Sequence, residues 1–212
     1  MDENLKATNR KRLQNAAQAL RKNGFDTEVF PTAASAAKHI LALVGSGKTI
    51  GAGGSMSVET LGILEKLKAA GNASAATGPG MDDGERRRVS LKAQAADFYF
   101  ASPQAVTAGG ELMFLDGIGN RASAVIYGPG KVVLVAGRNK LVKDLNEGLW
   151  RMRNVAAIAN NIRLSKKNPC VDSGVCEDCS SPERICNAVV MLWKKPRRTE
   201  YKVLLVDEEL GY

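Results

Sequence analysis

Short apolar segments that alternate with helical patterns constrain the fold of this chain more than any other feature. Residues 132–136 are entirely apolar and rich in valine, which is typical of a strand buried on both faces of a parallel sheet. Four further segments have strand-like composition. These segments are residues 25–30, 49–52, 98–102 and 201–207. Strands separated by helices predict an α/β fold with an open, mostly parallel sheet.

Helical spacing fills most of the chain between these strands. Leu13, Ala16, Ala17 and Leu20 follow i, i+3, i+4, i+7 spacing. Further helices are expected over residues 32–44, from 55 to about 70, up to Ala95, and over 141–162 in two pieces. Residues 111–116 and 122–127 are predicted to be antiparallel neighbours, and residues 72–84 a loop rich in Gly, Pro and Asp. Residues 188–193 form a late segment before the last strand.

The length and composition indicate one globular domain. Apolar residues make up 44% and charged residues 25% of the 212 positions. No apolar run approaches the roughly 18 residues of a membrane span, and the first ten residues are too polar for a signal peptide. We therefore expect a cytoplasmic protein with one domain over 1–212. Its expected parts are an N-terminal helical region (1–46), an α/β core (47–165), a cysteine loop (166–190) and a C-terminal strand (191–212).

The formal charge of +8 is compatible with three kinds of partner. Nucleic acid is disfavoured, because lysine and arginine are scattered and aromatic residues are only 5%. An anionic small molecule or an acidic protein explains the charge equally well. A zinc-containing nucleic-acid-binding or regulatory protein is kept as an alternative, and it requires binding that falls steeply with salt.

Four cysteines form the appendage of the expected α/β domain. They are Cys170, Cys176, Cys179 and Cys186, and residues 1–169 contain none. Clustered thiolates suit zinc or an iron–sulfur cluster, and reduced thiols in the cytoplasm argue against two disulfides. Structural zinc sites usually pair two C-x2–4-C clips, whereas Cys176 and Cys179 are the single clip here. Four sulfurs at irregular spacing favour a [4Fe–4S] cluster, with zinc as the alternative.

A glycine-rich turn follows the strand predicted at residues 49–52. Gly53, Gly54 and Ser55 lie where this strand passes into a helix. Glycines let a ligand approach the backbone, and a helix start offers free N–H groups to an anion. We therefore predict that these three residues bind a cofactor or another anionic ligand; a purely structural turn is the alternative.

Polar residues also cluster at the ends of the later predicted strands, where open α/β sheets bind ligands. The candidates are Ser102, Gln104, Thr107, Asp116, Asn120, Arg121, Arg138, Asn139 and Lys140. Asp116 is a candidate base, and Arg121, Arg138 or Lys140 would hold a carboxylate or phosphate. In the alternative, Asp116 and Asn120 hold the Gly-rich turn together and Asn139 caps a helix.

Several of these motifs together resemble the LUD domain of the LutC/YkgG lactate-utilisation family. They are IGAGGSMS at residues 50–57, ADFYFAS at 96–102, LDGIGNR at 115–121 and GRNK at 137–140. The cysteine stretch at 169–187 and VDEELGY at 206–212 match the cysteine-bearing, single-domain branch of that family. The resemblance covers about residues 5–212, and Gln104 stands where the family tends to carry asparagine.

The resemblance implies a NagB/RpiA/CoA-transferase-like sheet whose early glycine-rich turn faces a phosphate or cofactor. From their places at the strand ends, Asp116 and Arg121 are the catalytic candidates. The cofactor-binding candidates are Gly53, Gly54, Ser55, Ser102, Thr107, Asn120, Asn139 and Lys140. The resemblance further implies an accessory or redox subunit in the oxidation of L-lactate to pyruvate, beside iron–sulfur and oxidoreductase subunits. An enzyme acting on a phosphorylated sugar or acyl-CoA is the alternative, with Glu59 or Glu111 as its glutamate.

Overall fold

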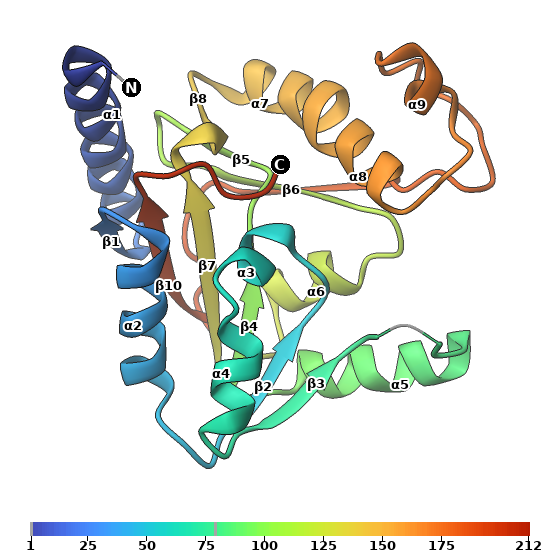
Figure 1. The fold of residues 1–212 in the computed structure, drawn as a ribbon, viewed down its shortest axis with the longest axis horizontal. Coiled ribbons are helices and arrows are strands. Elements are labelled where there is room, and N and C mark those ends of the chain that lie inside the picture. The colour runs from blue at the N-terminus through green and yellow to red at the C-terminus, as the bar shows by residue number, and fades with distance from the viewer. Residues whose placement is uncertain (1, 79) are drawn as a thin grey trace.

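The computed structural model describes residues 2–78 and 80–212, and its centre is a six-stranded sheet in which all paired neighbours are parallel (Figure 1). We call it sheet A. Its order across the sheet is β1 (Asp26–Phe30), β10 (Glu200–Val206), β7 (Lys131–Gly137), β4 (Phe98–Ala101), β2 (Thr49–Ala52) and β3 (Ala73–Ala76). The predicted open, mostly parallel sheet is confirmed.

Three helices cover one face of sheet A. They are α2 (Ala33–Val44), α3 (Met56–Thr60) and α4 (Ile63–Ala69). Ile40 of α2 and Leu67 of α4 are fully buried against Phe100 and Val133 of the strands. α2 begins where the sequence predicts, because the Thr32 hydroxyl accepts a hydrogen bond from the backbone N–H of Ser35 and caps the helix.

The opposite face of sheet A is covered by three helices and a second sheet. The helices are α1 (Glu3–Lys22), α5 (Asp83–Gln94) and α6 (Asn120–Ile126). The second sheet, which we call sheet B, has the order β8 (Leu141–Val142), β5 (Ala105–Thr107), β6 (Leu112–Asp116) and β9 (Ala188–Leu192). β6 is antiparallel to both β5 and β9, whereas β5 and β8 are parallel.

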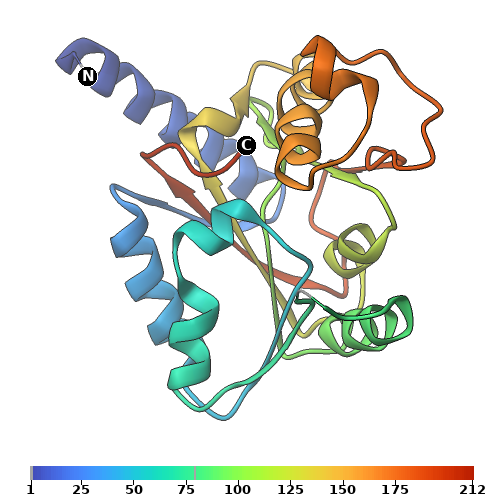
Figure 2. The ribbon, with the colours of Figure 1, turned by 45° about the vertical axis from the view of Figure 1, so that its right-hand side comes forward.

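A helical layer covers the outer side of sheet B. It consists of α7 (Leu145–Arg151), a π-helical stretch (Met152–Ala156) and α8 (Ala157–Arg163). Met113 of β6 and Met152 of the π-helical stretch are fully buried between sheet B and this layer. α9 (Pro169–Ser173) and the cysteine-bearing loop follow, and they project from the body in both views (Figures 1 and 2).

Two predicted elements are wrong. Residues 122–126 of the predicted strand 122–127 belong to helix α6, because the Asp116 carboxylate accepts the N–H groups of Arg121 and Ala122 and starts a helix there. The predicted loop at 72–84 contains the edge strand β3, whose alanines and serine carry little strand propensity. Residue 79 of that loop lies outside the described residues.

Two other predicted helices are interrupted. The helix from 55 to 70 is split into α3 and α4 at Gly62, whose φ of 58° only glycine adopts easily. The segment 141–162 starts as strand β8, and only then becomes helical. No helix within residues 2–78 and 80–212 is long and apolar enough to cross a membrane.

Candidate functional site

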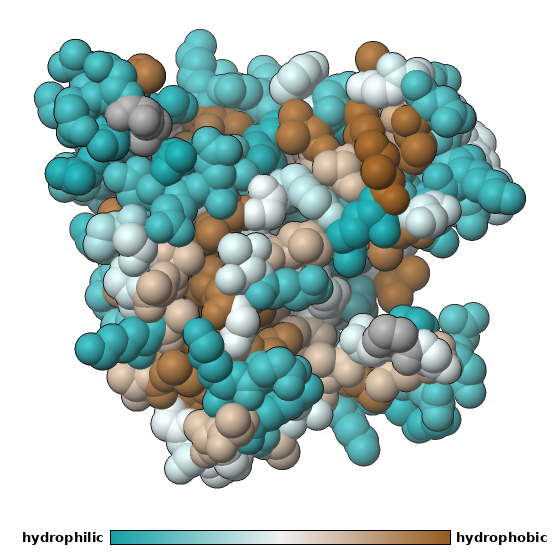
Figure 3. Space-filling model, viewed as in Figure 1, coloured by the Kyte–Doolittle hydropathy of each residue, from teal (hydrophilic) through white to brown (hydrophobic). Residues whose placement is uncertain are grey.

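A crevice of about 690 Å³ opens at the carboxyl ends of β2, β4 and β7, three adjacent strands of sheet A. This is the edge at which open parallel sheets bind ligands. Its opposite wall comes from α8, and Arg86 of α5 also lines it. The face of the molecule seen in Figure 3 is hollowed at this position, on the right, between α8 above and α5 below.

The crevice brings together eight of the ten predicted catalytic and cofactor-binding residues. They are Gly53, Gly54, Ser55, Ser102, Asp116, Asn120, Arg121 and Lys140. Thr107 and Asn139 are not among its lining residues. Thr107 is fully buried in sheet B, where its hydroxyl donates a hydrogen bond to the Glu111 carboxylate. Glu111 is therefore engaged away from the crevice, whereas Glu59 lines it.

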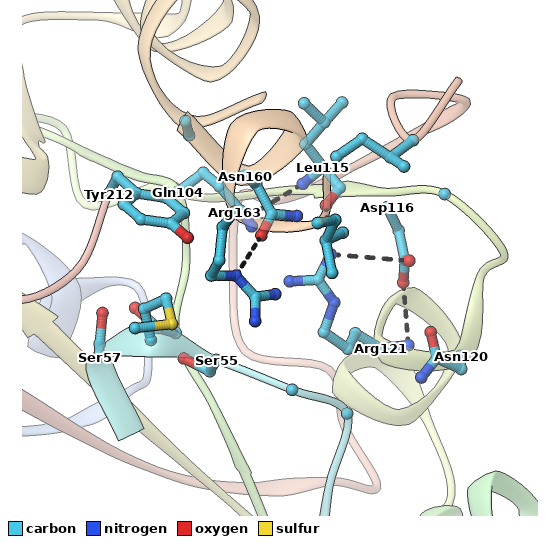
Figure 4. Close-up of a pocket in the computed structure, with 18 of the residues that line it drawn as sticks. Ser55, Ser57, Gln104, Leu115, Asp116, Asn120, Arg121, Asn160, Arg163 and Tyr212 are labelled. Carbon is cyan, nitrogen blue, oxygen red and sulfur yellow. Dashed lines mark hydrogen bonds and ion pairs between the residues drawn. The ribbon is translucent and has the colours of Figure 1, made fainter. Parts of the chain in front are cut away.

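Arg138 and Asn139 hold the C-terminal segment in place. Arg138 donates a hydrogen bond of 2.6 Å to the backbone carbonyl of Asp207. Asn139 accepts from the N–H of Leu210 at 3.1 Å and donates to the carbonyl of Gly211 at 2.9 Å. These contacts give both side chains structural roles, and they place Tyr212 in the crevice wall (Figure 4).

Lys140 lies at the base of the crevice with 2% of its surface exposed. Its Nζ donates hydrogen bonds of 2.8 Å to the hydroxyls of Ser57 and Ser102. Among the described residues, no carboxylate forms an ion pair with it. Burial, followed by the charges of Arg151 and Arg121, lowers the pKa of Lys140 to about 7. A large share of this amine is therefore uncharged near neutral pH.

Asp116 is committed to the backbone of α6. One carboxylate oxygen accepts the N–H groups of Arg121 at 2.9 Å and Ala122 at 2.8 Å. The other lies 3.7 Å from Nη2 of Arg121, and the residue is 3% exposed. This geometry favours the reading in which Asp116 holds the Gly-rich turn over the reading in which it acts as a base.

Two arginines face one another across the crevice. Arg121 donates through Nη2 to the carbonyl of Leu115 at 2.8 Å, and Arg163 donates through Nε to Oδ1 of Asn160 at 3.0 Å. Figure 4 shows the two guanidinium groups pointing toward each other from opposite walls. Each bond uses one donor, and an arginine has five. Further donors are thus available to an anion between the two arginines.

The glycine-rich turn packs closely against the side chains of Arg121 and Tyr99. A Cβ atom at Gly53 would overlap Cγ of Arg121 and the hydroxyl of Tyr99. Gly54 has a φ of 79° and faces open space. Ser55 begins α3 by accepting from the N–H of Val58 at 3.4 Å. Gly53 is therefore the position at which a side chain is excluded by contact, whereas Gly54 is required for its backbone angle.

Several lining residues were not predicted from the sequence. They are Ser57, Arg86, Asn160, Arg163 and Tyr212. Arg86, Arg121 and Arg163 carry three guanidinium groups in the lining, against the carboxylates of Glu59 and Asp116, and the protonated share of Lys140 adds to this positive charge. Burial raises the pKa of Tyr212, and the Arg163 charge partly offsets this rise. The balance of charge favours an anionic ligand.

The four cysteines line a second, small cavity of about 10 Å³. All are free thiols, and Arg153 donates through Nε to Sγ of Cys176 at 3.3 Å. Asn161 donates to Sγ of Cys170 at 3.6 Å. Within residues 2–78 and 80–212, no three His, Cys, Asp or Glu side chains are arranged as a formed metal site. The loop thus gathers four thiols around one space without setting them in ligating geometry.

The two cavities share a wall. Ala157, the first residue of α8, lines both of them. Ile185 lines the crevice, and its neighbour Cys186 lines the cysteine cavity. The π-helical stretch ends directly before Ala157, and such stretches often occur at functional sites. A group bound by the cysteines would therefore lie directly behind the wall of the crevice.

Comparison with known proteins gives one family and one fold. The LUD domain matches residues 13–206 of the chain. The crystal structure of a DUF162 family protein from Deinococcus radiodurans is similar, with a TM-score of 0.54 and 13% sequence identity. The similarity covers 93% of this chain and 98% of that chain, and at this identity it concerns the fold. The comparison with curated proteins gave no match.

Proposed function

The chain belongs to the LUD domain family, and we propose that it is a subunit of lactate utilisation from the LutC/YkgG branch. In this role it is an accessory or redox subunit in the oxidation of L-lactate to pyruvate. The observation that carries the proposal is the crevice, in which four motifs of the resemblance meet. These motifs contribute Gly53–Ser55, Ser102, Asp116 with Arg121, and Lys140 to one lining.

The ligand of the crevice is proposed to be an anionic small molecule. Arg121 and Arg163 offer donors from opposite walls, and charge-assisted bonds from arginine suit a carboxylate or phosphate. Three arginines against two carboxylates leave a net positive lining even without a charge on Lys140. Asp116 supports this site by fixing the start of α6, and with it the position of Arg121.

We further propose that Cys170, Cys176, Cys179 and Cys186 hold an iron–sulfur cluster, with zinc as the alternative. The support is the donor set itself, because four free thiols line one cavity. Arg153 and Arg184 both form ion pairs with Asp178 beside this cavity, so positive charge is available to offset thiolates. A bound cluster would supply one-electron transfer, whereas zinc would only order the loop.

Exposed apolar side chains support protein partners, which we propose to be iron–sulfur and oxidoreductase subunits in the cytoplasm. Val189 and Met191 lie on the outer face of β9, which is an edge strand of sheet B, and Trp193 follows. An edge strand with an apolar outer face is a ready site for pairing with another chain. Trp150 and Ile162 are exposed on the helical layer, where Figure 3 shows hydrophobic side chains over α7 and α8.

A second candidate function is an enzyme that acts on a phosphorylated sugar or acyl-CoA. The observation in its favour is that Glu59 lines the crevice, which places one carboxylate beside the proposed anion site. With an acyl-CoA, this function predicts a CoA thioester on Glu59, formed when CoA passes to the glutamate and the acyl group leaves as its free carboxylate. Peptide mapping that finds Glu59 unmodified would leave the lactate proposal alone.

Two measurements test the proposed function. Titration calorimetry with L-lactate, pyruvate and inorganic phosphate is expected to give binding that Arg121→Ala weakens about tenfold, from the loss of a charge-assisted bond. Arg87→Ala on exposed α5 is the matched control and should bind as wild type does. Anaerobic purification with iron, zinc and sulfide analysis tests the cysteines. Absence of binding by all three anions would refute the crevice, and metal-free protein would refute the cluster.

A further inference from the structure

Two buried lysines of this protein have opposite surroundings. Lys202 is 6% exposed and forms ion pairs with Asp26 and Glu28. Burial lowers its pKa, but the bonds to Glu28 and Asp26 outweigh burial and raise the pKa overall. Lys140 is 2% exposed and is bonded to two hydroxyls instead. The fold therefore neutralises one buried lysine, whereas the other has no carboxylate partner among residues 2–78 and 80–212.

The position of the Lys140 amine is fixed by its neighbours. Ser57 accepts from Nζ and donates its own proton to the carbonyl of Leu210 at 2.9 Å. Ser102 accepts from Nζ and donates to the carbonyl of Pro103 at 3.2 Å. Both hydroxyls are therefore satisfied without a charge on the amine. Nζ is held at one point of the crevice lining, which is the positioning that a nucleophile requires.

We propose that Lys140 is an amine nucleophile that forms an imine with a carbonyl compound carrying a carboxylate or phosphate group. The proposal rests on the proposed function, because the same anion-binding crevice receives the compound. Lysines that are desolvated or that lie next to other cations are the ones that attack carbonyl groups. Lys140 meets both conditions, since burial and the nearby Arg121 and Arg151 favour the uncharged amine.

The chemistry is balanced without an added oxidant or reductant. The Nζ lone pair attacks the carbonyl carbon, and the C=O π electrons move to oxygen, which takes a proton as nitrogen loses one. The resulting carbinolamine loses its hydroxyl as water when a C=N bond forms. Ser57 and Ser102 lie at hydrogen-bond distance from the nitrogen and position it for these proton transfers. Arg121 and Arg163 hold the anionic group of the compound.

Reductive trapping of the full-length protein tests this chemistry. Wild-type protein is incubated with pyruvate or dihydroxyacetone phosphate, reduced with cyanoborohydride, and mapped by peptide mass spectrometry. The expected result is an adduct on Lys140 at least about tenfold above that on exposed Lys143. Acetone, which has a carbonyl but no anion, should label neither residue selectively. The two anionic probes distinguish a 2-oxo acid from a keto phosphate as the preferred class.

Variants and a second ligand separate the possible failures. The Lys140→Arg variant should form no adduct at position 140. The Lys143→Arg variant is the matched control and should still form the adduct on Lys140. Equal labelling of Lys140 and Lys143, or no adduct on Lys140 with either anionic probe, would overturn the proposal, and this wild-type result does not depend on any variant folding. L-lactate has no carbonyl to trap. If lactate binds by calorimetry and no adduct forms, the imine alone is refuted; if lactate, pyruvate and phosphate all fail to bind, the proposed function fails as well.

Discussion

Replacing Lys140 with methionine is predicted to remove a pH-dependent cost from the stability of this protein. The pKa of Lys140 is about 7 in the folded state and 10.5 as the ordinary value. Between these values the unfolded chain binds one more proton than the folded chain, so stability rises with pH. The cost to the free energy of unfolding is fully present below pH 7. It is gone above pH 10.5, the pKa of this lysine in the unfolded chain. Burial of the amine is the largest cause of this cost, followed by the charges of Arg151 and Arg121, and no carboxylate among the described residues pairs with Lys140 to offset them.

The size of the effect follows from the two pKa values. One pH unit within the window corresponds to about 1.4 kcal/mol, and the change is smaller close to the folded pKa. The wild type should therefore gain about 2 kcal/mol of unfolding free energy from Lys140 between pH 7 and pH 9. For a chain of this length, this gain equals a Tm change of about 4–8 °C. Methionine is similar in volume and carries no charge, so the variant should lack this gain.

Urea unfolding at pH values from about 6 to about 9 measures the effect. The difference in unfolding free energy between wild type and Lys140→Met gives the contribution of Lys140 alone, because the other ionisable groups are the same in both proteins. Lys143→Met is exposed and serves as the matched control, with a profile parallel to that of the wild type. Parallel profiles for wild type and Lys140→Met would refute the reasoning, because they would mean that the buried amine stays protonated without cost.

Three further changes test the site. Asp116→Asn keeps the side-chain shape but replaces the charged acceptor of two backbone N–H groups with a neutral amide oxygen. The free energy of unfolding measured with urea should therefore fall by about 1–2 kcal/mol, with ligand affinity unchanged. Lost affinity at full stability would instead indicate a binding or catalytic role. Gly53→Ala should weaken calorimetric L-lactate binding about tenfold by displacing the Arg121 side chain, whereas Gly54→Ala should cost only about 1 kcal/mol of backbone strain; equal affinities would contradict this. Cys186→Ser should release metal from anaerobically purified protein and make residues 168–187 sensitive to protease, and full metal retention would exclude Cys186 as a ligand.

The strand pattern of sheet A could be predicted because its central strands are buried on both faces. The apolar run at 132–136 became β7, which lies between β4 and β10. The β3 strand could not be predicted, since Ala73–Ala76 form an edge strand that is partly exposed and carries small side chains. Helix α6 was missed for a different reason. The helix starts where the Asp116 carboxylate accepts two backbone N–H groups, and the hydrophobic periodicity of the sequence does not reveal these bonds.

One wall of the crevice could be predicted and the other could not. Ser102 and Lys140 follow parallel strands, and the carboxyl ends of such strands meet at one edge of a sheet. Arg86 and Arg163 come from helices far apart in the chain, and only tertiary packing brings them to the same cavity. The hydrogen bonds from Lys140 to Ser57 and Ser102 could not be predicted, because they join residues 83 and 38 positions apart.

Because β10 lies between β1 and β7, sheet A can be completed only after the end of the chain has been synthesised. β10 separates β1 from β7, and its Lys202 pairs with Asp26 across 176 positions. The first strand therefore leaves the ribosome with no neighbour to pair with, and β7 emerges with one edge open. Both edges stay available to other chains until residues 200–206 have been made. A nascent chain that stalls before this point should aggregate or require a chaperone, whereas one that passes it can close both edges by inserting a single strand.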